Sequence, residues 1–104
     1  PSLLPYYKGM HTHQRVLHTG DVWHGCTVHY VTAELDAGQA LAQGVLQVQI
    51  QDDVSSLAKR VHQLEHLIYP QVVEWICNGA LQHTHQGVLY RGQALQQPVQ
   101  FCNF

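Results

Sequence analysis

A long apolar stripe over residues 54–76 constrains the fold of this chain more than any other feature. Its members recur every three or four residues, the period of an amphipathic α-helix. They are Val54, Leu57, Ala58, Val61, Leu64, Ile68, Val72 and Ile76. The aspartate pair 52–53 is suited to cap the start of this helix, and the Asn-Gly pair 78–79 to end it. Pro70 lacks a backbone N–H, so it predicts a kink.

The remaining pattern predicts short elements on both sides of the helix. Side chains alternate along two segments before it, as they do in β-strands, and the loop over residues 32–39 would join these strands as an antiparallel pair. The predicted elements are a loop over 1–9, a short helix over 11–18, strands over 23–31 and 40–50, and a hairpin over 81–90. The glutamine-rich tail over 94–104 predicts no element. The fold class expected is therefore α/β.

Composition narrows the class of protein. The chain has 104 residues, of which 45% are hydrophobic and 12% are charged, as in one globular domain or part of one. The formal net charge of −2 argues against a nucleic-acid partner. Three cysteines without C-x-x-C spacing favour free thiols in a reducing compartment, so we expect a cytoplasmic protein. No apolar run is long enough to span a membrane, and no signal peptide is visible.

The end of the first strand and the loop after it carry candidate acid–base groups. His29 comes late in the strand, and Glu34 and Asp36 follow in a loop that ends at Gly38. A histidine and a carboxylate placed in this way can converge on one point, which is a common layout for proton transfer. The alternative is an ordinary strand followed by an acidic turn.

Glu65 is a second candidate, because it falls within the apolar stripe of the long helix. A buried carboxylate has to be satisfied by a partner or a ligand, since an unpaired buried charge is costly. His62, three residues earlier, lies on the same side of the helix. The alternative is that Glu65 lies at the edge of the stripe, in water.

Two His-Thr-His triplets, at residues 11–13 and 83–85, raise the question of a metal ion. On a strand, His83 and His85 would share a face and could bind one ion together. In the first triplet a helix would direct the rings apart. Because neither triplet has an acidic residue near it in sequence, we expect no metal site.

Three motifs, in order and widely separated, resemble the glycinamide ribonucleotide formyltransferase family. They are Pro-Ser-Leu-Leu-Pro-Tyr-Tyr-Lys-Gly at 1–9, His-Gly-Cys-Thr-Val-His-Tyr-Val-Thr-Ala-Glu-Leu-Asp-Ala-Gly at 24–38, and Glu-His-Leu-Ile-Tyr-Pro at 65–70. The resemblance extends to about Gly92. In the family, Ser-Leu-Leu-Pro follows Asn-x-His-Pro, and this chain begins at that proline. The resemblance therefore implies that residues 1–104 are the C-terminal part of a formyltransferase catalytic domain, with the N-terminal nucleotide-binding half absent.

The resemblance implies a fold and a reaction. The fold would be a three-layer α/β/α arrangement, to which this chain contributes antiparallel strands, a folate loop and the long kinked helix. The enzyme would transfer a formyl group from 10-formyltetrahydrofolate, the co-substrate, to the amine of glycinamide ribonucleotide in purine synthesis. The isolated chain would be inactive, because the family's catalytic asparagine and histidine and its phosphate site belong to the absent half.

The resemblance also implies roles for individual residues. Asp36 matches the catalytic aspartate, which would keep the absent histidine cationic and relay a proton through water, and His29 matches a second histidine near it. The cofactor-binding residues would be Val31, Thr32, Ala33, Leu35 and Asp36. The substrate-binding residues would be Pro1 and Glu65, with Glu65 accepting hydrogen bonds from ribose hydroxyls. The match at His62 is looser, because some relatives carry glutamine there. Ala37 stands where many members have glycine.

Two other interpretations remain open at this point. One is a sister enzyme, which formylates initiator methionyl-tRNA or hydrolyses formyltetrahydrofolate. The tRNA enzymes usually carry Arg-Gly where this chain has Lys8-Gly9. The other is a non-catalytic, histidine-rich metal-binding or interaction module.

On the formyltransferase interpretation, the strands and helix would leave apolar faces and an unpaired strand edge exposed. We therefore expect the chain to associate with itself or with the missing half.

Overall fold

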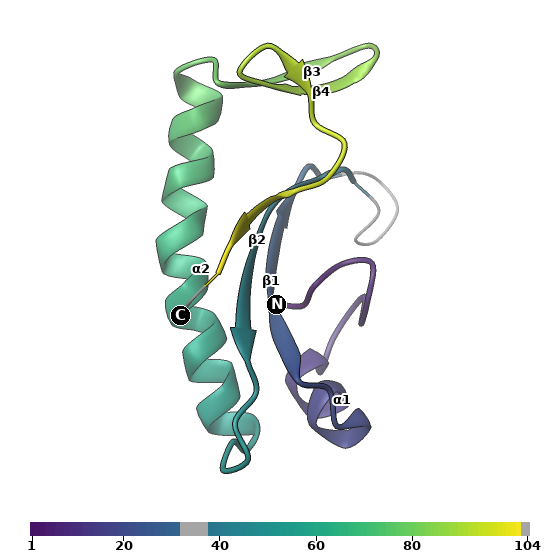
Figure 1. The fold of residues 1–104 in the computed structure, drawn as a ribbon, viewed down its shortest axis with the longest axis vertical. Helices are drawn as coiled ribbons and strands as arrows, with labels where there is room; N and C mark the ends of the chain where they lie inside the picture. Colours follow the sequence, from purple (N-terminus) through teal and green to yellow (C-terminus); the bar gives the residue numbers. More distant parts are fainter. Residues whose placement is uncertain (32–37, 103–104) are drawn as a thin grey trace.

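The structure, a computed structural model, describes residues 1–31 and 38–102 and has two small sheets and two helices. Its elements occur in the order α1 (Thr12–Thr19), β1 (Trp23–His29), β2 (Ala40–Gln47), α2 (Val54–Cys77), β3 (Leu81–Thr84), β4 (Gly87–Tyr90), β5 (Gln93–Ala94) and β6 (Val99–Phe101). Helix α2 runs along the β1–β2 pair, and the β3–β4 hairpin lies at its C-terminal end (Figure 1). The mixed α/β content agrees with the predicted class.

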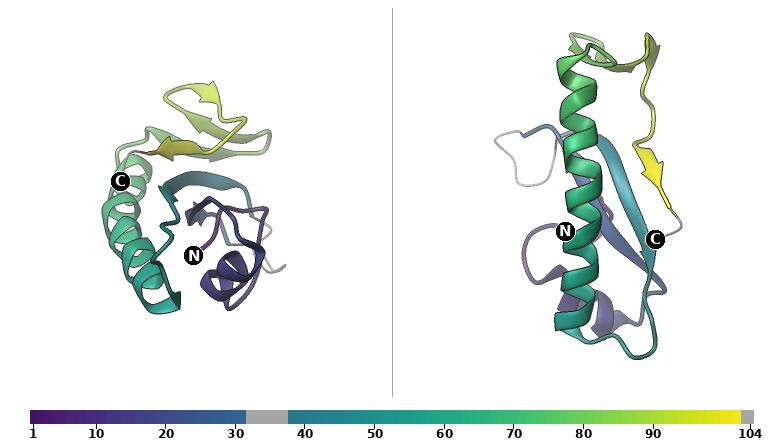
Figure 2. Two further views of the ribbon diagram at one scale, coloured as in Figure 1. Left: turned by 60° about the horizontal axis from the view of Figure 1, so that its bottom comes forward. Right: turned by 90° about the vertical axis from the view of Figure 1, so that its left-hand side faces the viewer.

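The main sheet has the strand order β1-β2-β6. Strands β1 and β2 are antiparallel, with Cys26 opposite Gly44, as the alternating pattern predicts. Strand β6 pairs parallel with β2 and lies in the tail for which the sequence predicts no element. After the hairpin the chain returns along β2, as two views of the ribbon show (Figures 1 and 2). Strand β2 therefore has a neighbour on each side, and the open edges of this sheet belong to β1 and β6.

Both strands of the antiparallel pair are shorter than predicted. Strand β1 ends at His29 and β2 at Gln47, so Ile50 lies outside the sheet and is fully exposed. The backbone N–H of Gln49 donates to the Asp52 carboxylate, and the N–H of Asp52 donates to the Gln49 carbonyl. These bonds turn the chain into α2 before the alternation of side chains ends, because local side-chain bonds compete with the sheet.

The ends of α2 form as the sequence predicts. Asp53 is the N-cap, and with Ser56 it makes a reciprocal capping box. Asn78 is the C-cap, and Gly79 follows with a φ of +83°. The helix is continuous through Pro70, and its ribbon shows no sharp break (Figure 2). The helix thus continues past Pro70, where the sequence predicts a kink.

The apolar stripe of α2 packs on the sheet except at its two ends, where Val54 and Ile76 are exposed. Leu57, Val61 and Leu64 share a core cluster with Cys26 and Leu46 of the sheet. Further along the helix, the buried residue is Trp75, and Ile76 is 42% exposed. The Trp75 ring lies 5.0 Å from that of Tyr90 and 5.9 Å from that of Phe101. The hairpin and the tail strand thus determine which side chain ends the stripe.

Gly44 lets α2 approach β2 closely. A Cβ at this position would lie 2.5 Å from Cγ of Leu64, in the core between helix and sheet. Such a separation is too short for two carbon atoms, so this position admits only glycine unless the core shifts. This close approach holds the middle of α2, which includes Glu65, against β2 at the point where Gly44 pairs with Cys26 of β1.

Candidate functional site

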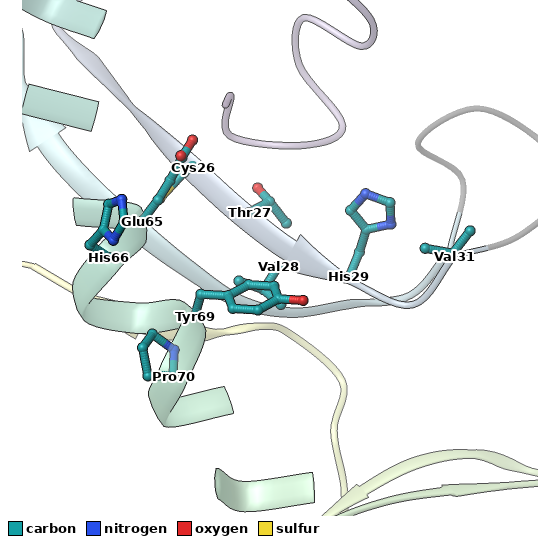
Figure 3. Close-up of a pocket in the computed structure, with 9 residues that line it drawn as sticks. All are labelled: Cys26, Thr27, Val28, His29, Val31, Glu65, His66, Tyr69 and Pro70. Atoms are coloured by element: carbon teal, nitrogen blue, oxygen red, sulfur yellow. The ribbon is translucent and has the colours of Figure 1, made fainter. Parts of the chain in front are cut away.

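A cleft of about 450 Å³ lies between the end of β1 and the middle of α2. The sheet side contributes Cys26, Thr27, Val28, His29 and Val31, and the helix side contributes Glu65, His66, Tyr69 and Pro70. Figure 3 shows Glu65 and His66 towards one end of this cleft and His29 towards the other. Three of the predicted site residues, His29, Val31 and Glu65, therefore line one cavity.

His29 is the last residue of β1, and its ring is held by the main chain. Its Nδ1 lies 2.8 Å from the carbonyl oxygen of Tyr30. Because a carbonyl only accepts, Nδ1 carries a proton and donates this hydrogen bond. His29 also lines a second cavity of about 60 Å³ together with Pro1 and Gly9. The structure thus brings Pro1 and His29 together at one end of the cleft.

Glu65 lies at the edge of the apolar stripe and not within it. Leu64 and Ile68 take the buried positions, while the Glu65 side chain keeps 37% of its surface exposed. Its Oε2 lies 3.6 Å from Nδ1 of His62. The carboxylate is therefore partly shielded from water and open to the cleft, a setting in which it can accept hydrogen bonds from a bound molecule.

A polar network holds the N-terminal loop against the sheet. The Thr27 hydroxyl donates to the Ser2 carbonyl at 2.7 Å and accepts from the Leu4 backbone N–H at 3.1 Å. The buried amide of Gln43 donates to the Leu4 carbonyl at 2.8 Å, and it accepts from the Gln100 amide at 3.0 Å. These bonds position Pro1 beside β1. Sequence reasoning missed them, because a threonine and a glutamine in alternating strands carry no distinctive signal.

A histidine pair, in which His24 is buried and His13 is half-buried, joins α1 to β1. Nδ1 of His13 and Nε2 of His24 are 3.0 Å apart, and His24 exposes only 1% of its surface. Burial lowers the pKa of His24 to about 4, with a further contribution from His13. Burial likewise lowers the pKa of His13. Both rings are therefore neutral near pH 7, so one can donate a hydrogen bond to the other. Sequence reasoning did not single out this pair.

Cys26 lines the cleft without being a candidate nucleophile. Its side chain is buried, and burial raises the pKa of its thiol to about 11. Because the thiolate is the reactive form of cysteine, this group is inert near neutral pH.

The structure describes only part of the predicted site. Thr32, Ala33, Leu35 and Asp36 lie outside the described residues. Over residues 1–31 and 38–102, no group of three His, Cys, Asp or Glu side chains could hold a metal ion. No helix in these same ranges is both long and apolar enough to span a membrane.

The prediction that His83 and His85 share one face of a strand is wrong. Strand β3 ends at Thr84, so His85 lies in the turn and the two rings do not share a strand face. The His83 ring instead lies 5.0 Å from the Tyr30 ring.

The fold and the cleft define a class of protein, and comparison identifies it. The family model described as "Formyl transferase" matches residues 1–73, and the chain belongs to this family. Among its relatives, phosphoribosylglycinamide formyltransferase of Escherichia coli is 42% identical over 95 residues, which are 91% of this chain and 45% of that protein. The human trifunctional purine biosynthetic protein adenosine-3 is 40% identical over 87 residues, 84% of this chain and 9% of that protein.

Solved structures agree on the fold. Phosphoribosylglycinamide formyltransferase of Coxiella burnetii superposes with a TM-score of 0.90 at 44% identity, covering 97% of this chain and 48% of that one. The predicted formyltransferase-type α/β fold is confirmed. The chain spans less than half the length of each relative named here.

Proposed function

We propose that this chain is the part of a phosphoribosylglycinamide formyltransferase that carries the folate loop and the ribose contact. The reaction moves a formyl group from 10-formyltetrahydrofolate to the amine of glycinamide ribonucleotide, a step of purine synthesis. The observation that carries the proposal is the shared cleft of His29 and Glu65, which come from different elements. Support also comes from the E. coli and Coxiella relatives, which bear the name of this enzyme.

The proposed reaction needs a proton relay. The amine nitrogen forms a bond to the formyl carbon, and the bond from that carbon to N10 of the folate then breaks. The amine loses one proton and N10 gains one. We assign the relay to Asp36, acting through water, with His29 beside it, because carboxylates and imidazoles are suited to such transfers. Residues 31–36 would bind the pterin through backbone groups.

Glu65 and Pro1 would bind the ribonucleotide. A carboxylate accepts hydrogen bonds only, so Glu65 suits the two hydroxyls of a ribose. Glu65 lies on the helix side of the cleft, and His29 lies towards its other end, at the end of β1. The ribose contact would therefore be at a different end of the cleft from the proposed proton relay. Pro1 lines the neighbouring small cavity with His29. The sugar would then lie along α2, with the amine towards the end of β1.

We further propose that the chain works together with a region equivalent to the part of its relatives that it does not cover. That region would supply the phosphate site and the groups that stabilise the oxyanion of the tetrahedral intermediate. Formyl transfer should therefore be close to background for the chain alone. It should appear when the chain is combined with the N-terminal part of the E. coli enzyme.

Substitution of Asp36 in this combined enzyme tests the proposed relay. Asp36→Asn should lower kcat by roughly 10²–10⁴, the usual range for acid–base groups, and should change folate binding much less. Asp53→Asn is the matched control, because Asn caps a helix as well as Asp does. An Asp36→Asn enzyme within threefold of the unsubstituted one would contradict the role of Asp36. Release of formate without formylation of the ribonucleotide would favour the hydrolase alternative.

A further inference from the structure

His62 and His66 form a close pair on the exposed side of α2, beside the cleft. They are four residues apart, so one helical turn brings both rings to the same face. Their Nε2 atoms are 2.9 Å apart and their ring centroids 4.3 Å apart. Both residues are exposed, so a small ion can reach them from solvent. The proposed formyl transfer does not use this pair.

The separation of the two nitrogens suits a metal ion. Imidazole nitrogens bind such ions at about 2.0–2.1 Å, so two of them at angles of roughly 90–110° lie about 2.9–3.4 Å apart. The observed 2.9 Å falls at the right-angled end of that range. Right angles between nitrogen ligands are typical of square-planar or tetragonal sites, which Cu²⁺ and Ni²⁺ prefer. The pair therefore needs little rearrangement to accept such an ion.

Glu65 adds a second, independent feature of a metal site. Its carboxylate faces Nδ1 of His62 at 3.6 Å, on the opposite side of the ring from the nitrogen that faces His66. Metal-binding histidines commonly direct their second nitrogen to a carboxylate, which fixes the ring and makes it a better ligand. The segment His62–His66 also has the H-x-x-E-H spacing of one class of zinc peptidases.

We propose that His62 and His66 form a two-histidine binding site for a divalent transition-metal ion at the rim of the cleft, with Glu65 orienting His62. Water would complete the coordination. The described residues offer no third ligand in reach, so the site binds an ion without the closed geometry of structural zinc. Affinity should follow the order Zn²⁺ < Ni²⁺ < Cu²⁺, since Ni²⁺ and Cu²⁺ suit both the ligand type and the angle. The two histidines take no part in the proposed transfer reaction, but the metal site shares Glu65 with the proposed ribose contact.

Calorimetric titration of the whole chain with Ni²⁺ tests this site. Ni²⁺ is the first probe because Cu²⁺ would oxidise the exposed thiols of Cys77 and Cys102. The titration is run in a Cys77→Ser, Cys102→Ser background, which removes the thiolates as ligands. We expect one equivalent of Ni²⁺ to bind, and at least about a tenfold loss of affinity in either His62→Ala or His66→Ala. Glu65→Gln should weaken binding by about tenfold or less, because outer carboxylates act indirectly.

The matched controls remove exposed histidines elsewhere. His18→Ala and the double variant His83→Ala, His85→Ala should bind Ni²⁺ as the unsubstituted chain does. Far-ultraviolet circular dichroism checks that α2 stays folded in each variant. In addition, Ni²⁺ should raise the melting temperature of the chain only when both His62 and His66 are present. The proposal would be overturned if the His62→Ala or the His66→Ala variant bound Ni²⁺ as tightly as the unsubstituted chain, or if the His83→Ala, His85→Ala variant lost binding.

Discussion

Glu65 is a single carboxylate whose position follows from the packing of its helix. Leu64 and Ile68 on either side are buried in the core, which leaves Glu65 at the edge of the stripe, facing the cleft. The sequence predicts a carboxylate that needs a partner, and the structure gives it His62 and an open cavity.

Removing this carboxylate should affect one substrate and not the other. In the combined enzyme, Glu65→Ala should raise the KM for the ribonucleotide by about tenfold, with the folate KM almost unchanged. Loss of a hydrogen bond to a charged group costs about 1.5 kcal/mol, the lower end of the usual range, because Glu65 is partly exposed. Steady-state kinetics with each substrate varied in turn measure the effect. Glu74→Ala, an exposed carboxylate on the same helix, is the control; equal changes in both KM values would mean that Glu65 is structural.

The His13–His24 pair makes stability depend on pH. The pKa of His24 is about 4 in the folded chain, against 6.5 for the ordinary side chain. Below pH 6.5 the unfolded chain therefore binds a proton that the folded chain does not, and stability falls as the pH falls towards 4. The expected loss across this window is on the order of 3 kcal/mol.

Urea unfolding at pH 7 and pH 5 measures this dependence. The free energy of unfolding should be lower at pH 5, and His24→Gln should flatten the difference. His18→Gln, at an exposed position on α1, should leave it unchanged. A chain equally stable at both pH values would show that His24 is not held neutral by burial.

At the scale of elements, the contact between β2 and α2 depends on one glycine. Gly44→Ala should destabilise the fold by about 1–3 kcal/mol, because the new methyl group meets the Leu64 side chain in a packed core. Urea unfolding gives the value. The same substitution in a Leu64→Ala background should cost little, because the atoms that it would meet are gone. Equal costs in both backgrounds would place the strain elsewhere.

The elements that sequence reasoning recovers are those with strong local signals. Helix α2 has a long stripe and clear caps, and its observed bounds of Val54–Cys77 agree closely with the predicted stripe. The β1–β2 pair follows from alternation, although local bonds at Asp52 end β2 three residues before the predicted end at Ile50. Strand β6 could not be predicted, because a three-residue strand gains its stability from its partner and not from its own pattern.

The residues of the candidate site also divide into those with a local sequence signal and those without one. Glu65 stands out because a carboxylate interrupts an apolar pattern, and family resemblance points to His29 and Pro1. The His13–His24 pair and the network around Thr27 depend on contacts between residues far apart in sequence. No local pattern reveals such contacts. The His62–His66 spacing can be read from the sequence, but the distance between the two facing nitrogens comes only from the structure.

At the scale of the whole molecule, several large apolar side chains are exposed. Tyr6, Met10, Val22 and Trp23 lie on the N-terminal part of the chain, and Leu67, Tyr69 and Val73 lie on α2. Strand β1 is also at an edge of its sheet. Exposed large apolar side chains and open strand edges are features that other chains can cover. The structure is thus in keeping with the expectation of association.

Sedimentation velocity over a range of concentrations tests that expectation. The chain alone should form dimers or larger species, and adding the N-terminal part of the E. coli enzyme should convert these to a complex of the two. Trp23→Ser should weaken self-association, whereas Gln49→Ser, at an exposed polar position, should not. A monomer that persists at every concentration and does not bind the added part would count against the proposed assembly.

The parallel pairing of β6 with β2 also affects how the chain is made. Gln43 and Gln100, which face each other across this pairing, are 57 residues apart in sequence. During synthesis on the ribosome, β2 emerges long before its second neighbour does. Its edge therefore stays open while α2 and the hairpin are completed, and open edges can pair with other nascent chains. The sheet gains β6 only after residues 99–101 have also been made.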